Sequence, residues 1–376
     1  GVQARSARRL GEGRTAEVAR PLNGGLLLAV AVGLPLCALT WWATPRLFPF
    51  LAPEPGVAEI GAGYLQARLL ALVAVGMNFA FRGHWNGVNR SVVYLRTLVV
   101  MHAVNIGVNW LLIYGHLGAP QLGAVGAGVG SAVSTWVGTA MYLVQGFTLA
   151  RDQGFARGLP GRDTMRTMLR LSLPASLQQF LFAAGWVALF AILGRMGTQT
   201  GAAANVLVQL MLVSILPGLA MGMAAASLVS QALGRKDPAD AKAWGWDVAK
   251  VAVVVMGLLG LVMALLPDLV LSPFLDSPET MDLARGPLRL FGLSVALDGV
   301  GLVLMNALFG AGASRQVAAV SISLQWGLFL PLAWFLGPHL GLGLMAIWAA
   351  QIGYRLLQAG VFAWIWQRGR WATIEV

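Results

Sequence analysis

The amino-acid sequence predicts an all-α polytopic membrane protein. Of its 376 residues, 57% are hydrophobic and only 11% are charged, whereas soluble domains carry about 25% charged residues. The 14 Trp and 47 Gly residues suit a helical bundle in lipid, because Trp favours the membrane interface and small residues let helices approach closely. The single cysteine excludes a disulfide-stapled chain.

Ten segments are long and apolar enough to cross a bilayer as helices, for which about 20 residues are needed. They cover 22–45, 60–81, 95–115, 122–149, 169–194, 202–233, 248–272, 286–309, 316–336 and 340–366. None shows the strict alternation of apolar and polar residues that a lipid-facing barrel strand requires. We therefore expect every span to be a helix.

The net charge of +11 would indicate nucleic-acid binding in a soluble protein. Here most of the 26 Lys and Arg residues fall in alternate loops, on one side of the predicted membrane, while acidic residues collect in the opposite loops. By the positive-inside rule, both ends of the chain are predicted to be cytoplasmic. We expect a multi-pass protein of the bacterial inner (plasma) membrane, with the lipid bilayer rather than nucleic acid as its partner.

Two parts of the sequence resemble each other at a nearly constant offset. LGEGRTAEVA (10–19) resembles LGRKDPADAK (233–242), and GVNR (87–90) resembles GASR (312–315). The constant offset predicts two copies of one helical unit in the same orientation. Parallel repeats of this kind are common in secondary transporters, with the substrate site between the halves.

The repeat divides the chain into an N-terminal lobe at 1–150, a cytoplasmic linker at 151–168 and a C-terminal lobe at 169–376. The first two helices of the second copy, 169–194 and 202–233, have no counterpart in the first copy. We therefore expect a full protein of twelve helices in two six-helix lobes. This chain would contain ten of them and lack the first two.

Four segments together resemble the multidrug and toxic compound extrusion (MATE) family. They are HAVNIGVNWLLIYGHLGAPQLGAVGAG (102–128), LSLPASLQQ (171–179), LVSQALGRKDPADAKAWG (228–245) and DGVGLVLMNALFGAGASR (298–315). The resemblance implies two six-helix lobes that export cationic or amphipathic organic compounds, driven by inward flow of sodium or protons. It is NorM-like rather than DinF-like, since DinF-type members have an Asp where this chain has Asn109.

Asp298 lies well inside the apolar run FGLSVALDGVGLVLMNALFG, while the other acidic residues fall in loops or tails. A carboxylate at membrane depth must be protonated, ion-bound or paired, and is a functional hypothesis by default. The alternative is a structural bond to a neighbouring helix. Arg355 is also deep and is a candidate partner. By resemblance, Asp298 matches the cation-binding Asp of the second lobe, twelve residues before Gly310, and sodium there is the one metal ion expected.

The helix at 169–194 contains no acid, although NorM-type members usually carry a glutamate there. Gln178 and Gln179 offer amide oxygens instead, which can ligate sodium but cannot release a proton. The alternative is that both glutamines form hydrogen bonds between helices. The tyrosine that the family has one turn before Asp298 is Ser294 here.

In the first lobe, Asn105 and Asn109 are four residues apart and share one helix face. Their amide oxygens could join a cation site, and by resemblance Ala127 and Ser131 match the family's ligand positions on the next helix. Structural hydrogen bonding across helices is the alternative.

Pro217 and Gly218 interrupt the predicted span 202–233. Proline removes one helix hydrogen bond and favours a kink. The pair is therefore a hinge candidate, with a packing kink as the alternative reading.

No phosphate-binding P-loop, zinc-binding HExxH or GxSxG nucleophile motif occurs in the sequence. The sequence thus predicts no enzyme and no cofactor other than a coupling ion. Together with the resemblance, it predicts a monomeric secondary antiporter that exports cationic or amphipathic compounds such as drugs in exchange for sodium or protons, by alternating access. The alternative is a flippase for lipid-linked oligosaccharide, which the scarcity of Arg within spans disfavours. No substrate-binding residue is predicted.

Overall fold

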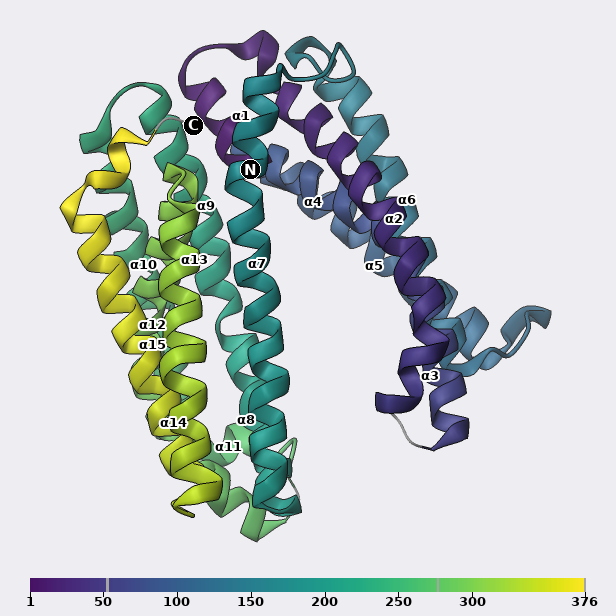
Figure 1. Cartoon of the computed structure of the whole chain (residues 1–376), viewed down its shortest axis with the longest axis vertical. Coiled ribbons are helices and arrows are strands. Elements are labelled where there is room, and N and C mark those ends of the chain that lie inside the picture. The colour runs from purple at the N-terminus through teal and green to yellow at the C-terminus, as the bar shows by residue number, and fades with distance from the viewer. Residues whose placement is uncertain (52–53, 276, 375–376) are drawn as a thin grey trace. The chain divides into compact units, whose positions relative to one another are not determined.

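The computed structural model describes residues 1–376 except 52–53, 276 and 375–376, and the described part is helical without strands (Figure 1). The helices of the first half are α1 (Val2–Gly11), α2 (Arg20–Leu51), α3 (Pro55–Leu69), α4 (Leu72–Gly87), α5 (Ser91–Tyr114) and α6 (Gly123–Leu149). Those that follow are α7 (Arg162–Leu193), α8 (Thr198–Ser214), α9 (Leu216–Gly234), α10 (Pro238–Leu265), α11 (Pro267–Leu271), α12 (Pro278–Ala311), α13 (Ser314–Ile322), α14 (Leu330–Trp334) and α15 (Gly343–Arg368). Two π-helical stretches, Ser323–Phe329 and Phe335–His339, flank α14.

Among the described residues, seven helical segments are long and apolar enough to cross a membrane, and the pair α3–α4, bent by 46° at its break, makes an eighth if it is counted as one span. The remaining two predicted spans, 122–149 and 340–366, do form continuous helices, α6 and α15, but are less apolar. In α6 the cause is repeated Gly, Ser and Thr, and in α15 it is the polar residues Gln351, Arg355 and Gln358. At 27 and 26 residues, each is still long enough to span about 30 Å of hydrocarbon.

The chain divides into two compact units, Gly1–Met168 and Leu169–Val376. In the first unit, α2 packs against α3 and α4, while α6 packs against both α3 and α5. An aromatic core holds one end of the unit together, where Phe81 of α4 stacks on Tyr142 of α6 at 5.3 Å between ring centroids. Trp85 is fully buried beside them.

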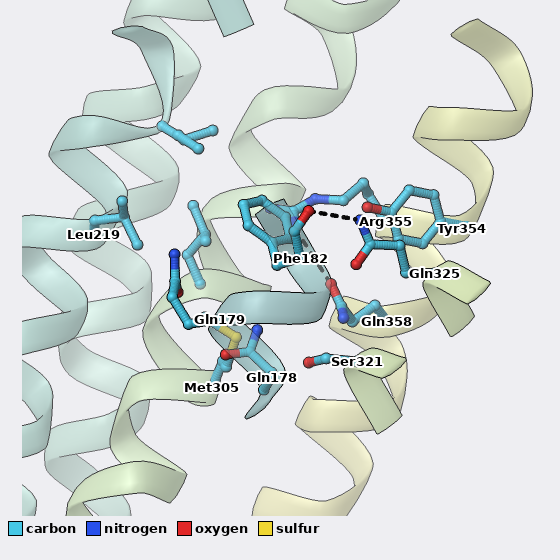
Figure 2. Close-up of a pocket in the computed structure, with 12 residues that line it drawn as sticks. Gln178, Gln179, Phe182, Leu219, Met305, Ser321, Gln325, Tyr354, Arg355 and Gln358 are labelled. Carbon is cyan, nitrogen blue, oxygen red and sulfur yellow. Dashed lines mark hydrogen bonds between the residues drawn. The ribbon is translucent and has the colours of Figure 1, made fainter. Parts of the chain in front are cut away.

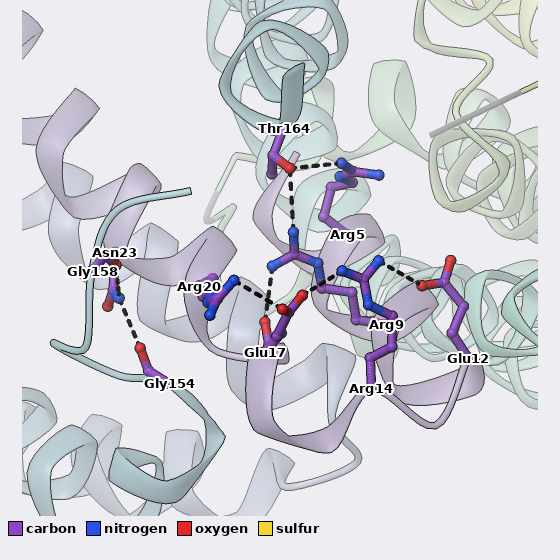
Figure 3. Close-up of polar contacts among 10 residues, drawn as sticks. All are labelled: Arg5, Arg9, Glu12, Arg14, Glu17, Arg20, Asn23, Gly154, Gly158 and Thr164. Atoms are coloured by element: carbon purple, nitrogen blue, oxygen red, sulfur yellow. Dashed lines mark hydrogen bonds and ion pairs between the residues drawn. The ribbon is translucent and has the colours of Figure 1, made fainter. Parts of the chain in front are cut away.

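The start of α7 is tied to the beginning of the chain (Figure 3). Arg5 and Arg9 of α1 both donate to the Thr164 hydroxyl, at 3.0 and 3.2 Å. Burial lowers the pKa of the Arg9 guanidinium, and the nearby charge of Arg5 lowers it further. Helix α7 begins at Arg162, so the last residues of the predicted linker 151–168 are already helical.

The loop before α7 is also anchored to the first unit. The Asn23 side chain on α2 donates to the carbonyl oxygens of Gly154 and Gly158, at 2.9 and 2.7 Å, and accepts from the Ala156 amide. These bonds satisfy backbone groups that would otherwise be left unpaired in a partly buried loop. The loop therefore has a defined conformation.

Helix α12 is the centre of the second unit and packs against α8, α9, α10 and α15. Its closest approaches occur at glycine. A Cβ placed on Gly292 of α12 or on Gly260 of α10 would collide with the other glycine's carbonyl oxygen. Small residues at such crossings let the two backbones meet, as is usual for membrane helices. This packing fixes the position of Asp298 on α12.

Candidate functional site

Asp298 on α12 and Arg355 on α15 form a buried ion pair. Arg355 donates from Nε to Asp298 Oδ1 at 2.9 Å and from Nη2 to Oδ2 at 2.8 Å. The two side chains are only 8% and 14% exposed, for Asp298 and Arg355 respectively. The sequence named Arg355 as a candidate partner, and this pairing is confirmed. The guanidinium occupies one acceptor position on each carboxylate oxygen, so a cation that binds Asp298 at those positions must displace Arg355.

Arg355 lines a cavity in the second unit (Figure 2). The cavity offers about 90 Å³ to the centres of water molecules, which is room for several waters, since one water needs about 10–15 Å³ on this measure. Drug-sized ligands occupy pockets of about 300–1,000 Å³. The cavity therefore suits water or a small ion, and no substrate-sized site follows from it.

The cavity wall is rich in neutral polar side chains. Gln178 and Gln179 of α7 line it as the sequence analysis anticipated, together with Gln325, Gln358 and Ser321. The two predicted glutamines differ in burial: Gln178 is buried, with 8% of its surface exposed, whereas Gln179 is largely exposed. The structure thus brings both glutamines to the cavity of Arg355, while Asp298 lies behind the guanidinium. Whether they ligate an ion stays a prediction.

Three polar residues of this wall were not anticipated. Gln325 donates to the Phe182 carbonyl oxygen at 3.3 Å, and Gln358 accepts from Arg355 Nη1 at 3.4 Å. The hydroxyl of Ser321 is buried and has no hydrogen-bond partner among the described residues. A signal for Gln358 was present, because Gln351, Arg355 and Gln358 recur at helical spacing on α15. Gln325 lies in a π-helical stretch, whose register the α-helical spacing does not predict.

In the first unit, the predicted residues Asn105, Asn109 and Ser131 lie together between α5 and α6. Asn109 Nδ2 donates to Asn105 Oδ1 at 3.2 Å, and Asn105 Nδ2 lies 3.5 Å from the hydroxyls of Ser131 and Ser134. Ser134 was not anticipated. Asn109 Oδ1 is buried without a hydrogen-bond partner among the described residues. The cluster thus has one unused amide oxygen, of the kind that ligates hard cations.

Pro217 and Gly218 lie just after a break in the predicted span 202–233. Helix α8 ends at Ser214 and α9 begins at Leu216, with Pro217 in its first turn. A Cβ on Gly218 would come within 2.7 Å of Met256 Sδ and 2.9 Å of Leu302 Cδ1. The interruption is therefore real and tightly packed, and its role as a hinge stays a prediction.

No group of three or more His, Cys, Asp or Glu side chains is placed to hold a metal ion within the described residues. Any ion at these two clusters would rely on amide and hydroxyl oxygens, with Asp298 as the only buried acid in the described part of the chain.

The MatE family model matches residues 1–111 and 174–335. The chain belongs to the MatE family. Similar curated relatives include a probable multidrug resistance protein NorM from Brucella suis biovar 1, which is 27% identical over 344 residues covering 88% of this chain and 72% of the relative. The corresponding protein from Rhodopseudomonas palustris is 26% identical, over 94% of this chain and 76% of the relative.

Solved structures share the fold of this MatE-family chain. A multidrug resistance MATE family transporter of the MOP superfamily, in an outward-facing conformation, aligns with a TM-score of 0.89 at 19% identity, covering 100% of this chain and 84% of the other. A MOP superfamily transporter from Pyrococcus furiosus aligns with a TM-score of 0.87 at 19% identity, again over 100% and 84%. The predicted all-α polytopic membrane fold and the NorM-like resemblance are confirmed.

Proposed function

We propose that the chain is a multidrug efflux transporter that exports cationic or amphipathic organic compounds in exchange for sodium or protons, by alternating access of its two lobes. Its membership of the MatE family carries this proposal, and its NorM-named relatives support the substrate class. A transporter, rather than an enzyme, is the role that follows.

The coupling ion is proposed to act at two clusters, one in each unit. In the second unit these are Asp298, Gln178 and Gln179, and in the first they are Asn105, Asn109 and Ser131. A buried ionisable residue is the usual mark of an ion pathway in membrane proteins, and the unused oxygen of Asn109 supports a role for the first cluster. Coupling requires that the ion bind the two conformations of the transporter with different affinities.

The scarcity of arginine within the predicted spans favours drug export over the flipping of a lipid-linked oligosaccharide. That cargo carries phosphates, which call for unpaired arginines along the pathway. We also propose that the protein lies in the bacterial inner membrane as a monomer with both ends of this chain in the cytoplasm.

Ethidium efflux from energised cells tests the proposal. The full-length protein that contains this chain and its Asp298→Asn variant would be compared under separately imposed sodium and proton gradients. We expect efflux that follows one gradient and is lost in Asp298→Asn. The matched control is Asp247→Asn, because Asp247 is exposed and pairs only with Lys250 within the same helix, so its loss should leave efflux unchanged.

Each variant must be present in the membrane at wild-type level for the comparison to count. Absence of gradient-driven efflux of any cationic dye by the well-expressed full-length protein would overturn drug export. Movement of lipid-linked sugar by the same preparation would then favour the flippase.

A further inference from the structure

The carboxylate of Asp298 already has a cation within the protein. The Arg355 guanidinium bonds to both carboxylate oxygens, at 2.8 and 2.9 Å, which is the planar two-point geometry that arginine provides. The pair is almost completely buried. A positive charge carried by the chain itself thus stands where a bound monovalent cation would otherwise be required.

The intact pair offers no unpaired acidic group to a second cation. The residues that face Arg355 across the cavity are neutral amides, hydroxyls and apolar groups, and Asp298 is the only buried Asp or Glu among the described residues. The pair therefore sums to zero. A monovalent cation beside the intact pair would thus meet no acid that is not already paired with Arg355.

Other hydrogen-bond acceptors line the same cavity as the Arg355 guanidinium. This cavity has space for several waters, and the Gln178, Gln179 and Gln358 side chains line it. Figure 2 shows these side chains gathered around one space. Their amide oxygens are acceptors for a displaced guanidinium. The third nitrogen, Nη1, already makes a long bond of 3.4 Å to Gln358 Oε1.

We propose that Arg355 is a tethered competitor of the coupling ion at Asp298. With Arg355 bonded to Asp298, the second unit is closed to a monovalent cation. The cation reaches Asp298 only when the guanidinium swings to the amide oxygens of the cavity, and Arg355 returns when the cation leaves. Arg355 is thus a positioning residue for ion exchange, a role that rests on the proposed function.

Binding of sodium alone to the purified full chain in detergent tests this without any need for transport. Isothermal titration calorimetry would compare the wild type with Arg355→Gln, Arg355→Lys and the double variant Arg355→Gln/Asp298→Asn. Removing the guanidinium leaves a buried carboxylate that needs a cation. We expect at least about tenfold tighter sodium binding in Arg355→Gln, lost again in the double variant.

The Lys variant guards against misfolding of Arg355→Gln. A lysine ammonium is a single point of charge and cannot bond both carboxylate oxygens in the same planar way, so sodium affinity should lie between those of the wild type and Arg355→Gln. The matched control is Arg285→Gln, which removes a half-buried arginine, outside the cavity, that is paired with Asp268 and Asp282. It should bind sodium as the wild type does.

Unchanged sodium affinity in Arg355→Gln that elutes as the wild type does would overturn the proposal. A sodium affinity of Arg355→Lys equal to that of the wild type would also overturn it. A third contradicting result would be sodium binding at Asp298 in the wild type that is already as tight as in Arg355→Gln. The two proposals can fail separately. If Arg355→Gln binds sodium more tightly but the protein moves no dye, the competition between Arg355 and the ion stands and drug export is wrong. If gradient-driven efflux occurs but Arg355→Gln binds sodium as the wild type does, drug export stands and the competition is wrong.

Discussion

Arg355 on α15 donates two hydrogen bonds to the carboxylate of Asp298 on α12, across 57 positions of sequence. This contact joins two helices that pack along the centre of the second unit. It also engages both oxygens of the one buried acid among the described residues.

Breaking the ion pair from one side should cost much more stability than replacing both partners. Asp298→Leu leaves the Arg355 charge buried and unpaired, so we expect a loss of about 3–5 kcal/mol in the free energy of unfolding. The double variant Asp298→Leu/Arg355→Met should be more stable than Asp298→Leu alone. Chemical unfolding in detergent measures both. Additive losses in the double variant would contradict the pairing.

Gly130 should matter because it makes room for Asn109. A Cβ at Gly130 on α6 would collide with the Asn109 side-chain oxygen. We therefore expect Gly130→Ala to reduce ion-driven dye efflux about as strongly as Asn109→Ala does, by displacing the unused oxygen. Gly107→Ala on α5 is the control, since a Cβ there meets nothing within 4 Å. Normal efflux in Gly130→Ala beside a defective Asn109→Ala would disprove this coupling.

The crossing of α10 and α12 should be intolerant of any added side chain. Gly260→Ala places a methyl group against the Gly292 carbonyl, and overpacking of this kind costs about 1–3 kcal/mol. Gly257→Ala on the same helix is the matched control, because its Cβ would lie 3.5 Å from the Ala296 Cβ in ordinary contact. Thermal unfolding in detergent should show a lower midpoint for Gly260→Ala only. Equal midpoints for Gly260→Ala and Gly257→Ala would contradict this prediction, because they would show that a methyl group at position 260 costs no stability.

Pro217 should affect transport more than stability. It lies in the first turn of α9, directly after the break at Ile215, and cannot donate a hydrogen bond to the preceding turn. Pro217→Ala restores that donor and should stiffen the break, which slows ethidium efflux several-fold while the unfolding midpoint is kept or raised. Pro238→Ala, at the start of α10, is the control. A lowered midpoint with normal efflux would favour a packing role.

The sequence was sufficient for the local properties of this protein. Continuous apolar runs predicted where helices form, and all ten expected segments contain helix, although 60–81, 202–233 and 248–272 are each interrupted once, at Leu70–Ala71, Ile215 and Leu266. The isolation of Asp298 within such a run marked it as the residue of interest before any contact was known. The spacing of Asn105 and Asn109 placed both on one face of α5, where they are hydrogen-bonded. These properties depend on residues close together along the chain, so composition and periodicity reveal them.

Only the tertiary structure decided which side chains meet. The sequence could name Arg355 as a candidate for Asp298, but the rotation of α15 against α12 brings the guanidinium onto both oxygens. The π-helical stretch of Gln325 and the contact of Gly130 with Asn109 likewise depend on how helices are turned and spaced. Each step along a helix rotates a side chain by about 100°. Contacts between helices are therefore fixed by packing, which no single segment contains.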